Sequence, residues 1–201
     1  MTLLDLCSYL GIGAAGAAGL NLLLGLLISM RYSPVRRWPH RKLDIFASHR
    51  WTAWCTIVLT LSHPIVLLFL DKPPFRVFDI LVPIQSPLQP FINLAGAGAL
   101  YLLLLVFLTS ILRTRIGRPL WRRLHYLVFP AAILLFIHSI LTDPELKDGH
   151  PDLLDGGKVF LEILAVVCFL AVAVRIRLRG RGLRANGRRN GAVAVSNRMG
   201  G

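Results

Sequence analysis

Apolar residues fall in five long blocks along this chain, and each block is bounded by charged residues, prolines or glycines. The blocks cover Leu3 to Met30, Ile45 to Leu70, Phe91 to Leu112, Leu124 to Leu141, and Val159 to Val174. A helix needs about 20 mostly apolar residues to cross the hydrocarbon core of a bilayer. The pattern therefore predicts an all-α, polytopic membrane helical bundle with five transmembrane helices.

The first block is predicted to be a retained helix and not a cleaved signal peptide. Only Asp5 is charged near its start, so the basic region of a signal peptide is missing. The block also runs well beyond the roughly 7–15 apolar residues of a signal sequence.

Composition agrees with a membrane protein, since 55% of the 201 residues are hydrophobic and 16% are charged. The net charge of +13 is a feature of nucleic-acid-binding proteins, but here it is distributed by connection. Residues 31–42 and 113–123 each carry five basic side chains, whereas residues 71–90 and 142–158 each carry two. Basic connections mark the cytoplasmic side. We therefore expect the N-terminus outside, the C-terminus in the cytoplasm, and no nucleic-acid partner.

Two regions follow from this pattern, a transmembrane domain over residues 1–174 and a basic cytoplasmic tail over residues 175–201. The tail is rich in Arg, Gly and Asn and carries eight arginines. Such a composition has little to bury, so we expect disorder. The tail either anchors the topology or binds anionic lipid, and both readings stay open.

Four histidines lie inside the apolar blocks, His49 and His63 in the second and His125 and His138 in the fourth. An ionisable residue within a span is costly and marks function. These two blocks run in the same direction because one helix separates them. The first histidine of one block therefore pairs with the first histidine of the other. This places His49 with His125 near the cytoplasmic face and His63 with His138 near the outer face. At 1.5 Å per residue, the two layers lie about 20 Å apart.

The helical phase of the two blocks differs. Fourteen residues leave His63 about 40° from the face of His49, but thirteen leave His138 about 140° from the face of His125. Pro130 lies between His125 and His138, and a proline inside a helix is a cause of a kink or a local change of winding.

Two facing imidazoles suit the axial positions of haem iron, whereas zinc prefers three or four clustered ligands. We therefore predict two b-type haems, held without the CxxCH attachment motif. Haem propionates need cations, and Arg50, Arg122 and Arg123 lie next to the inner pair, where they can also act as interface anchors. For the outer pair the sequence offers only Lys72 and Arg76.

Small residues and cysteines have a simpler reading. The runs GIGAAGAAG and AGAGA let helices or a flat macrocycle approach closely, and helix packing is the commoner reason for such runs. Cys7, Cys55 and Cys168 form no metal or disulfide motif and are predicted to pack as small apolar residues. We expect no chemical role for His40 and His150.

Two histidines spaced by 14, followed by two spaced by 13 behind the basic start WRRLH, resemble the ferric reductase-like transmembrane domain. This superfamily includes ferric-chelate reductases, NADPH oxidases and the bacterial haem subunit that serves periplasmic methionine sulfoxide reductase. The resemblance covers about residues 41–141. It implies that the four histidines ligate two stacked b haems, and that electrons pass from a cytosolic donor outward. It also implies an integral protein of a bacterial inner membrane.

Two departures from the larger relatives limit what the resemblance implies. Those relatives have six spans and a flavin- and NADPH-binding domain, whereas this chain has five blocks and no expected flavin or nicotinamide site. The donor is then a separate flavoprotein or a quinol, and the acceptor lies outside. We expect a haem-dependent oxidoreductase subunit with no general acid, base or nucleophile. A divalent-metal transporter using the same histidines, or a structural membrane subunit, remains the alternative.

Overall fold

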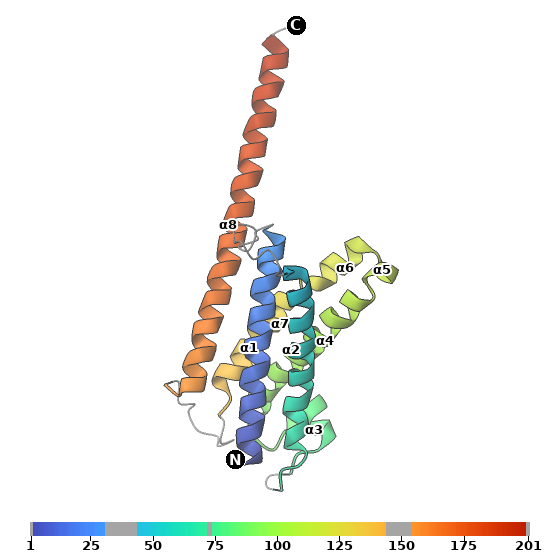
Figure 1. The fold of residues 1–201 in the computed structure, drawn as a ribbon, viewed down its shortest axis with the longest axis vertical. Helices are drawn as coiled ribbons and strands as arrows, with labels where there is room; N and C mark the ends of the chain where they lie inside the picture. Colours follow the sequence, from blue (N-terminus) through green and yellow to red (C-terminus); the bar gives the residue numbers. More distant parts are fainter. Residues whose placement is uncertain (1, 31–43, 72–73, 144–153, 200–201) are drawn as a thin grey trace.

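Within the described residues, every regular element is a helix. The computed structural model describes residues 2–30, 44–71, 74–143 and 154–199, with side chains up to residue 180. The long helices run side by side in Figure 1. Their bounds are α1 (Leu3–Ser29), α2 (Ile45–Leu67), α4 (Pro90–Ile111), α7 (Val128–Leu141) and α8 (Gly156–Met199). Shorter helices connect them: α3 (Val77–Leu81), η2 (Pro83–Gln85), α5 (Arg113–Ile116) and α6 (Arg118–His125).

Four helical segments of the described chain are long and apolar enough to cross a membrane. They are Leu3–Ser29, Pro90–Ile111, Arg118–Leu141 and Gly156–Gly180. The predicted second span, α2, has 23 residues but is not among them. The polar side chains of His49, Arg50 and His63 within it lower its apolar character. The count of five spans therefore stays a prediction.

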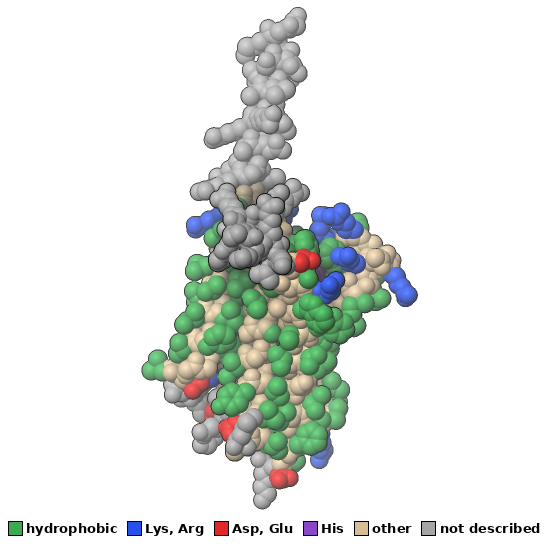
Figure 2. Space-filling view, viewed as in Figure 1, with side chains coloured by type: hydrophobic (Ala, Val, Ile, Leu, Met, Phe, Trp, Pro, Cys, Tyr) green, Lys and Arg blue, Asp and Glu red, His purple; other side chains and the backbone are tan. Residues whose placement is uncertain are grey.

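The outside of the bundle is apolar along the sides of the helices and basic at one end. Figure 2 shows hydrophobic side chains covering the flanks, and Lys and Arg side chains gathered over α5 and α6. Exposed Leu, Ile, Val and Phe side chains on these flanks match a surface in contact with lipid. The basic end is the feature from which the orientation is predicted, and the orientation stays a prediction.

The bundle is built from two helix pairs, α1 with α2 and α4 with α7, and α8 packs against α1 and α7. One core cluster joins Ala15, Ala99, Leu135 and Leu161, which come from four different helices. Ala15 and Ala99 are fully buried, so alanine at these positions lets the helix backbones approach closely. Cys168 is buried with α1 leucines in a second cluster, which confirms its predicted packing role.

A break between α6 and α7 reduces the mismatch in helical phase between His125 and His138. Pro130 has no N–H and cannot bond the carbonyl four residues earlier, that of Tyr126. Tyr126 O instead accepts from Phe129 N at 3.1 Å, and Leu127 N donates to Leu124 O at 3.0 Å, both over three residues. Such bonds wind the chain at 3.0 residues per turn, so each residue turns about 20° more than in an α-helix. This extra turn acts against the mismatch, and the predicted local change of winding is confirmed.

The C-terminal helix α8 continues to Met199, past the predicted end of the fifth span, and extends beyond the other helices in Figure 1. Side chains beyond residue 180 lie outside the description. The division of the chain at residue 174 and the disorder of the tail stay predictions.

Asn21 links the first two helices by polar contacts inside the bundle. Its Nδ2 donates to the carbonyl oxygen of His49 at 2.6 Å and to Oγ1 of Thr52 at 2.7 Å. Replacing Asn21 with the similarly sized Leu should lower the free energy of unfolding by about 1 kcal/mol, the usual contribution of polar contacts between membrane helices. Unfolding in mixed detergent and SDS micelles measures this. Leu20→Ala, on the exposed side of α1, is the matched control, and equal midpoints for both variants would contradict the prediction.

Candidate functional site

The structure brings the four histidines together in the two predicted pairs. The ring centroids of His49 and His125 are 6.4 Å apart with 72° between the ring planes. Those of His63 and His138 are 6.2 Å apart with 71° between the planes. In each pair α2 provides one ring, and α6 or α7 provides the other. The two pairs therefore have nearly the same geometry at two levels of the bundle.

Three of the histidines donate Nδ1–H to a backbone carbonyl of the neighbouring helix. A carbonyl oxygen only accepts hydrogen bonds, so the proton of each neutral ring lies on Nδ1. Nδ1 of His49, His63 and His138 lies 3.1, 2.8 and 2.9 Å from the carbonyl oxygens of Asn21, Cys7 and Ile92, respectively.

His125 has a side-chain partner instead. Its Nδ1 lies 3.3 Å from Oγ of Ser110. The single hydroxyl hydrogen of Ser110 is donated to Val106 O at 2.7 Å, and Trp121 Nε1 donates to the same Oγ at 3.3 Å. The Ser110 oxygen therefore acts as an acceptor toward His125, and this ring also carries its proton on Nδ1.

All four rings are thus held in the tautomer that leaves Nε2 with a free lone pair. This is the arrangement of metal-ligating histidines, whose other ring nitrogen donates to a carbonyl or a similar acceptor. Within the described residues there is no group of three or more His, Cys, Asp or Glu side chains that could hold a metal ion. Each pair therefore presents two imidazoles to whatever lies between them.

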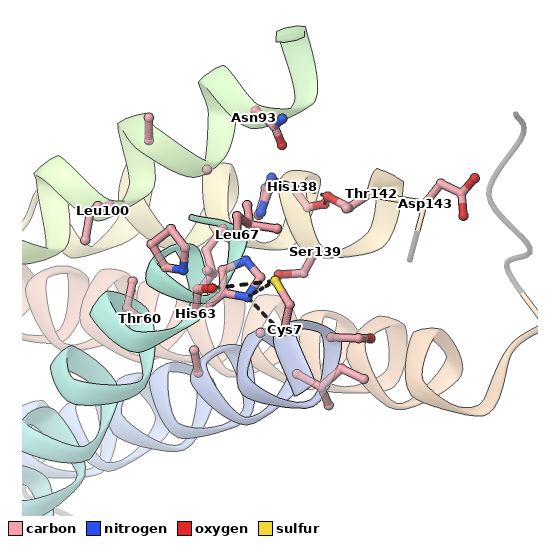
Figure 3. A pocket seen from close by; sticks show the side chains of 18 of the residues that line it. Cys7, Thr60, His63, Leu67, Asn93, Leu100, His138, Ser139, Thr142 and Asp143 are labelled. Atoms are coloured by element: carbon pink, nitrogen blue, oxygen red, sulfur yellow. Dashed lines mark hydrogen bonds between the residues drawn. The ribbon is translucent and has the colours of Figure 1, made fainter. Parts of the chain in front are cut away.

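A cavity of about 160 Å³ opens at the outer pair and is lined by residues of α1, α2, α4, α7 and α8. Figure 3 shows His63 and His138 extending into it from α2 and α7, with Cys7 of α1 bonded to His63. Most of the lining is apolar, and polar side chains such as Asn93 and Asp79 contribute to it as well. This composition fits a mostly apolar ligand with a polar edge.

Lys158 is a cation at the outer cavity that the sequence interpretation missed. It is 3% exposed, lines the cavity, and donates Nζ to the carbonyl oxygens of Ile140, at 2.6 Å, and Thr142. These carbonyls lie at the end of α7, where helical partners are lacking. Of the two predicted cations, Arg76 is exposed at the start of α3 and does not line the cavity, and Lys72 lies outside the described residues.

Arg175 is the corresponding residue at the inner pair. A cavity of about 80 Å³ there is lined by His49, His125 and Arg175 among others. The Arg175 guanidinium carbon lies 5.8 Å from the ring centroids of both Tyr126 and Phe129. It is half-buried, whereas the three predicted arginines of the inner layer are exposed and do not line this cavity: Arg50, Arg122 and Arg123.

A signal for Arg175 was present in the sequence. Leu161, Cys168 and Arg175 follow one another at intervals of seven, and the first two are buried in the bundle. Residues seven apart lie on one helix face. The sequence pattern assigns Arg175 to the tail because it begins the run of arginines. The helix face that carries Leu161 and Cys168 nevertheless continues through Arg175.

Comparison with known protein families gives one match. Residues 14–136 match a family described as "Ferric reductase like transmembrane component". The matched segment contains His49, His63 and His125, and it ends two residues before His138. No curated protein and no solved structure matches the chain.

Ser110→Ala should change the tautomer of His125 alone. The variant removes the acceptor of its Nδ1–H, and a net hydrogen bond of about 1 kcal/mol corresponds to a change of several-fold in the tautomer ratio. Ring-nitrogen NMR shifts of ¹⁵N-histidine-labelled protein measure the ratio for each ring. Thr109→Val is the control, because the Thr109 hydroxyl donates to the carbonyls of Leu105 and Val106 and not to a histidine. Unchanged His125 shifts in Ser110→Ala would remove Ser110 from this role.

Proposed function

Since this chain belongs to the family of ferric reductase-like transmembrane components, we propose that it carries electrons across a membrane by means of two b-type haems, one at each histidine pair. The family match covers more than half of the chain, which confirms the resemblance drawn from its histidines and its basic start. The chain is an integral membrane protein of a class that serves transmembrane electron transfer. The observation that carries the finer proposal is the pair of facing imidazoles at each level.

The separation within each pair fits an iron atom between two imidazoles. A metal–nitrogen bond to histidine is about 2.0 Å, and bond lengths near 1.33 Å put a ring centroid about 1.1 Å behind its nitrogen. Two imidazoles that bound one metal ion from opposite sides would then have centroids about 6.2 Å apart. The observed separations are 6.4 Å for His49 with His125 and 6.2 Å for His63 with His138.

The chain orients the imidazoles and surrounds each pair with apolar side chains. The Nδ1–H bonds of the four rings prevent the imidazoles from turning their lone pairs away from the gap. Apolar side chains around each pair exclude water, and burial is one of the properties by which a protein tunes a redox centre. Haem iron supplies one-electron redox chemistry when bound. No described side chain is required to act as an acid, a base or a nucleophile.

Cations at the cavities support the binding of a ligand with acidic edges. Arg175 lines the inner cavity between two uncharged aromatic rings, and Lys158 lines the outer cavity. A partly buried charge is favourable where it meets an opposite charge. We propose that Arg175 binds an inner propionate and that Lys158 lies near an outer one. Arg50, Arg122 and Arg123 remain candidates at the rim of the inner layer.

We further propose that α2 is the fifth span. The contacts of α2 with α1 extend from His49, beside Asn21, to His63, beside Cys7. α2 therefore covers much of the length of a helix that itself qualifies as a span. Five spans with the basic connections inside place the inner pair near the cytoplasm. Electrons would then pass outward from a separate flavoprotein or a quinol to an acceptor outside, in a bacterial inner membrane.

Haem content of the purified chain tests the proposal. Protein produced with ample haem and extracted in mild detergent should show a reduced α-band and two haems per chain. His63→Ala and His138→Ala should each leave one haem with the same spectrum and midpoint potential. His49→Ala and His125→Ala should each leave the other haem. His150→Ala is the control and should keep both. A colourless wild type would exclude the proposal and bring metal transport forward.

Arg175→Gln should weaken retention of the inner haem by about tenfold. This corresponds to the loss of a hydrogen bond to a charged group, at about 1.5 kcal/mol. The rate of haem transfer to a soluble haem-binding protein measures retention. The matched control is Arg177→Gln, an exposed residue two positions along the same helix. Equal acceleration in both variants would indicate a general effect of surface charge and would contradict a direct contact.

A further inference from the structure

We propose that Gly11, Gly25 and Gly96 are positioning residues, each of which holds one imidazole by leaving a helix carbonyl open to the histidine Nδ1–H. The inference deepens the proposed function and rests on it for the identity of the ligand. It concerns how this chain presents its ligand nitrogens.

Each glycine lies directly against a histidine ring. A Cβ added at Gly96 would lie 2.8 Å from Cε1 and Nδ1 of His138. One added at Gly11 would lie 3.0 Å from Cε1 of His63, and one added at Gly25 would lie 3.2 Å from Cε1 of His49. Real Cβ atoms essentially never lie closer than 3.0 Å to such a neighbour, and at 3.0–3.4 Å the neighbour must move by a few tenths of an ångström. Glycine is therefore required for the ring position at Gly96, and favoured at Gly11 and Gly25.

The carbonyl that receives each Nδ1–H belongs to the residue four positions before the glycine. In an α-helix this carbonyl already accepts the N–H of the glycine itself. A carbonyl oxygen has a second lone pair, and a ring can reach it only where no side chain stands beside it. The three sets are Cys7 with Gly11 and His63, Asn21 with Gly25 and His49, and Ile92 with Gly96 and His138.

The sequence spacing matches this arrangement. Gly11 and Gly25 are 14 residues apart, as are His49 and His63, and the two helices run antiparallel. One register of α1 against α2 therefore serves both layers. In the pair of α4 with α7, Gly96 serves His138. The corresponding place opposite His125 is filled by Ser110, whose hydroxyl oxygen takes the part of the carbonyl.

Other glycines of α1 show what helix packing alone looks like. A Cβ on Gly19 would meet the side chain of Leu164 on α8 at 2.7 Å, and one on Gly13 would meet Leu59 at an ordinary 3.7 Å. The predicted packing role of the small-residue run therefore applies to Gly19. Gly11 and Gly25 differ from it because their neighbour is an imidazole that also bonds the backbone.

Alanine substitutions test the inference, with haem as the probe. Gly96→Ala and Gly11→Ala should each displace one outer imidazole, so that one of the two ferrous haems binds carbon monoxide or is lost. The number of haems per chain that do not bind carbon monoxide should therefore fall twofold, from two to one. Gly25→Ala should have the smallest effect and act on the inner haem. Gly13→Ala is the matched control and should keep two haems that do not bind carbon monoxide. Alanine favours helix more than glycine does, so a loss cannot be assigned to a weaker helix.

A double variant and a second readout sharpen the test. The double variant Gly11→Ala with Gly96→Ala should lose the outer haem and keep the inner one, because both glycines contact the outer pair, His63 and His138. In haem-free ¹⁵N-histidine-labelled protein, each single variant should shift the ring nitrogens of its own histidine and no other.

The outcomes separate this inference from the proposed function. If the wild type holds two haems and the Gly96→Ala and Gly11→Ala variants keep both unreactive toward carbon monoxide, the positioning role is overturned and the proposed function stands. The positioning role is equally overturned if Gly13→Ala has the same effect as Gly11→Ala. If the wild type holds no haem, the proposed function fails. The nitrogen shifts then decide the positioning role alone, and unchanged shifts in the three variants would overturn it.

Discussion

The hydrogen bond from each imidazole Nδ1 to an acceptor on the neighbouring helix is the constraint on which the rest of the site depends. It determines which ring nitrogen carries the proton, and so which nitrogen keeps a free lone pair. It also ties α2 to α1 and α7 to α4 at the depth where each histidine lies. The orientation of the imidazoles and the pairing of helices in this bundle are therefore two results of the same contacts.

The surrounding structure accommodates these bonds in two ways. On α1 and α4, missing side chains expose carbonyl oxygens, so the acceptor is the backbone. At His125 the acceptor is Ser110, whose own hydrogen is directed to Val106 O and whose oxygen also receives Trp121 Nε1. The break after His125 then gives α7 a phase of its own, and His138 faces His63 although thirteen residues of ideal helix would turn it away.

Much of this could be predicted from the sequence, because apolar length and buried charge leave strong signals. The helical class, the pairing of the four histidines and the role of Pro130 followed from spacing and simple helix geometry. Lys158 and Arg175 did not, since Lys158 lies in the first turn of α8, in a stretch that looks like a connection, and Arg175 lies inside α8, in a stretch that looks like the start of a tail. The acceptors at Cys7, Asn21 and Ile92 were beyond prediction, because a main-chain oxygen is present at every position and is distinguished only by what packs against it.

The helix that provides a histidine to both levels, α2, also falls short of the apolar character of the four candidate spans. α2 would therefore partition into lipid less readily by itself than its neighbours. His49 and His63 donate to two carbonyls of α1, and Thr52 accepts from Nδ2 of Asn21. Because α1 precedes α2 in the chain, it leaves the ribosome first and is available as a polar partner when α2 emerges. On this basis we expect the histidine-bearing helix to insert cooperatively with α1, in the order of synthesis.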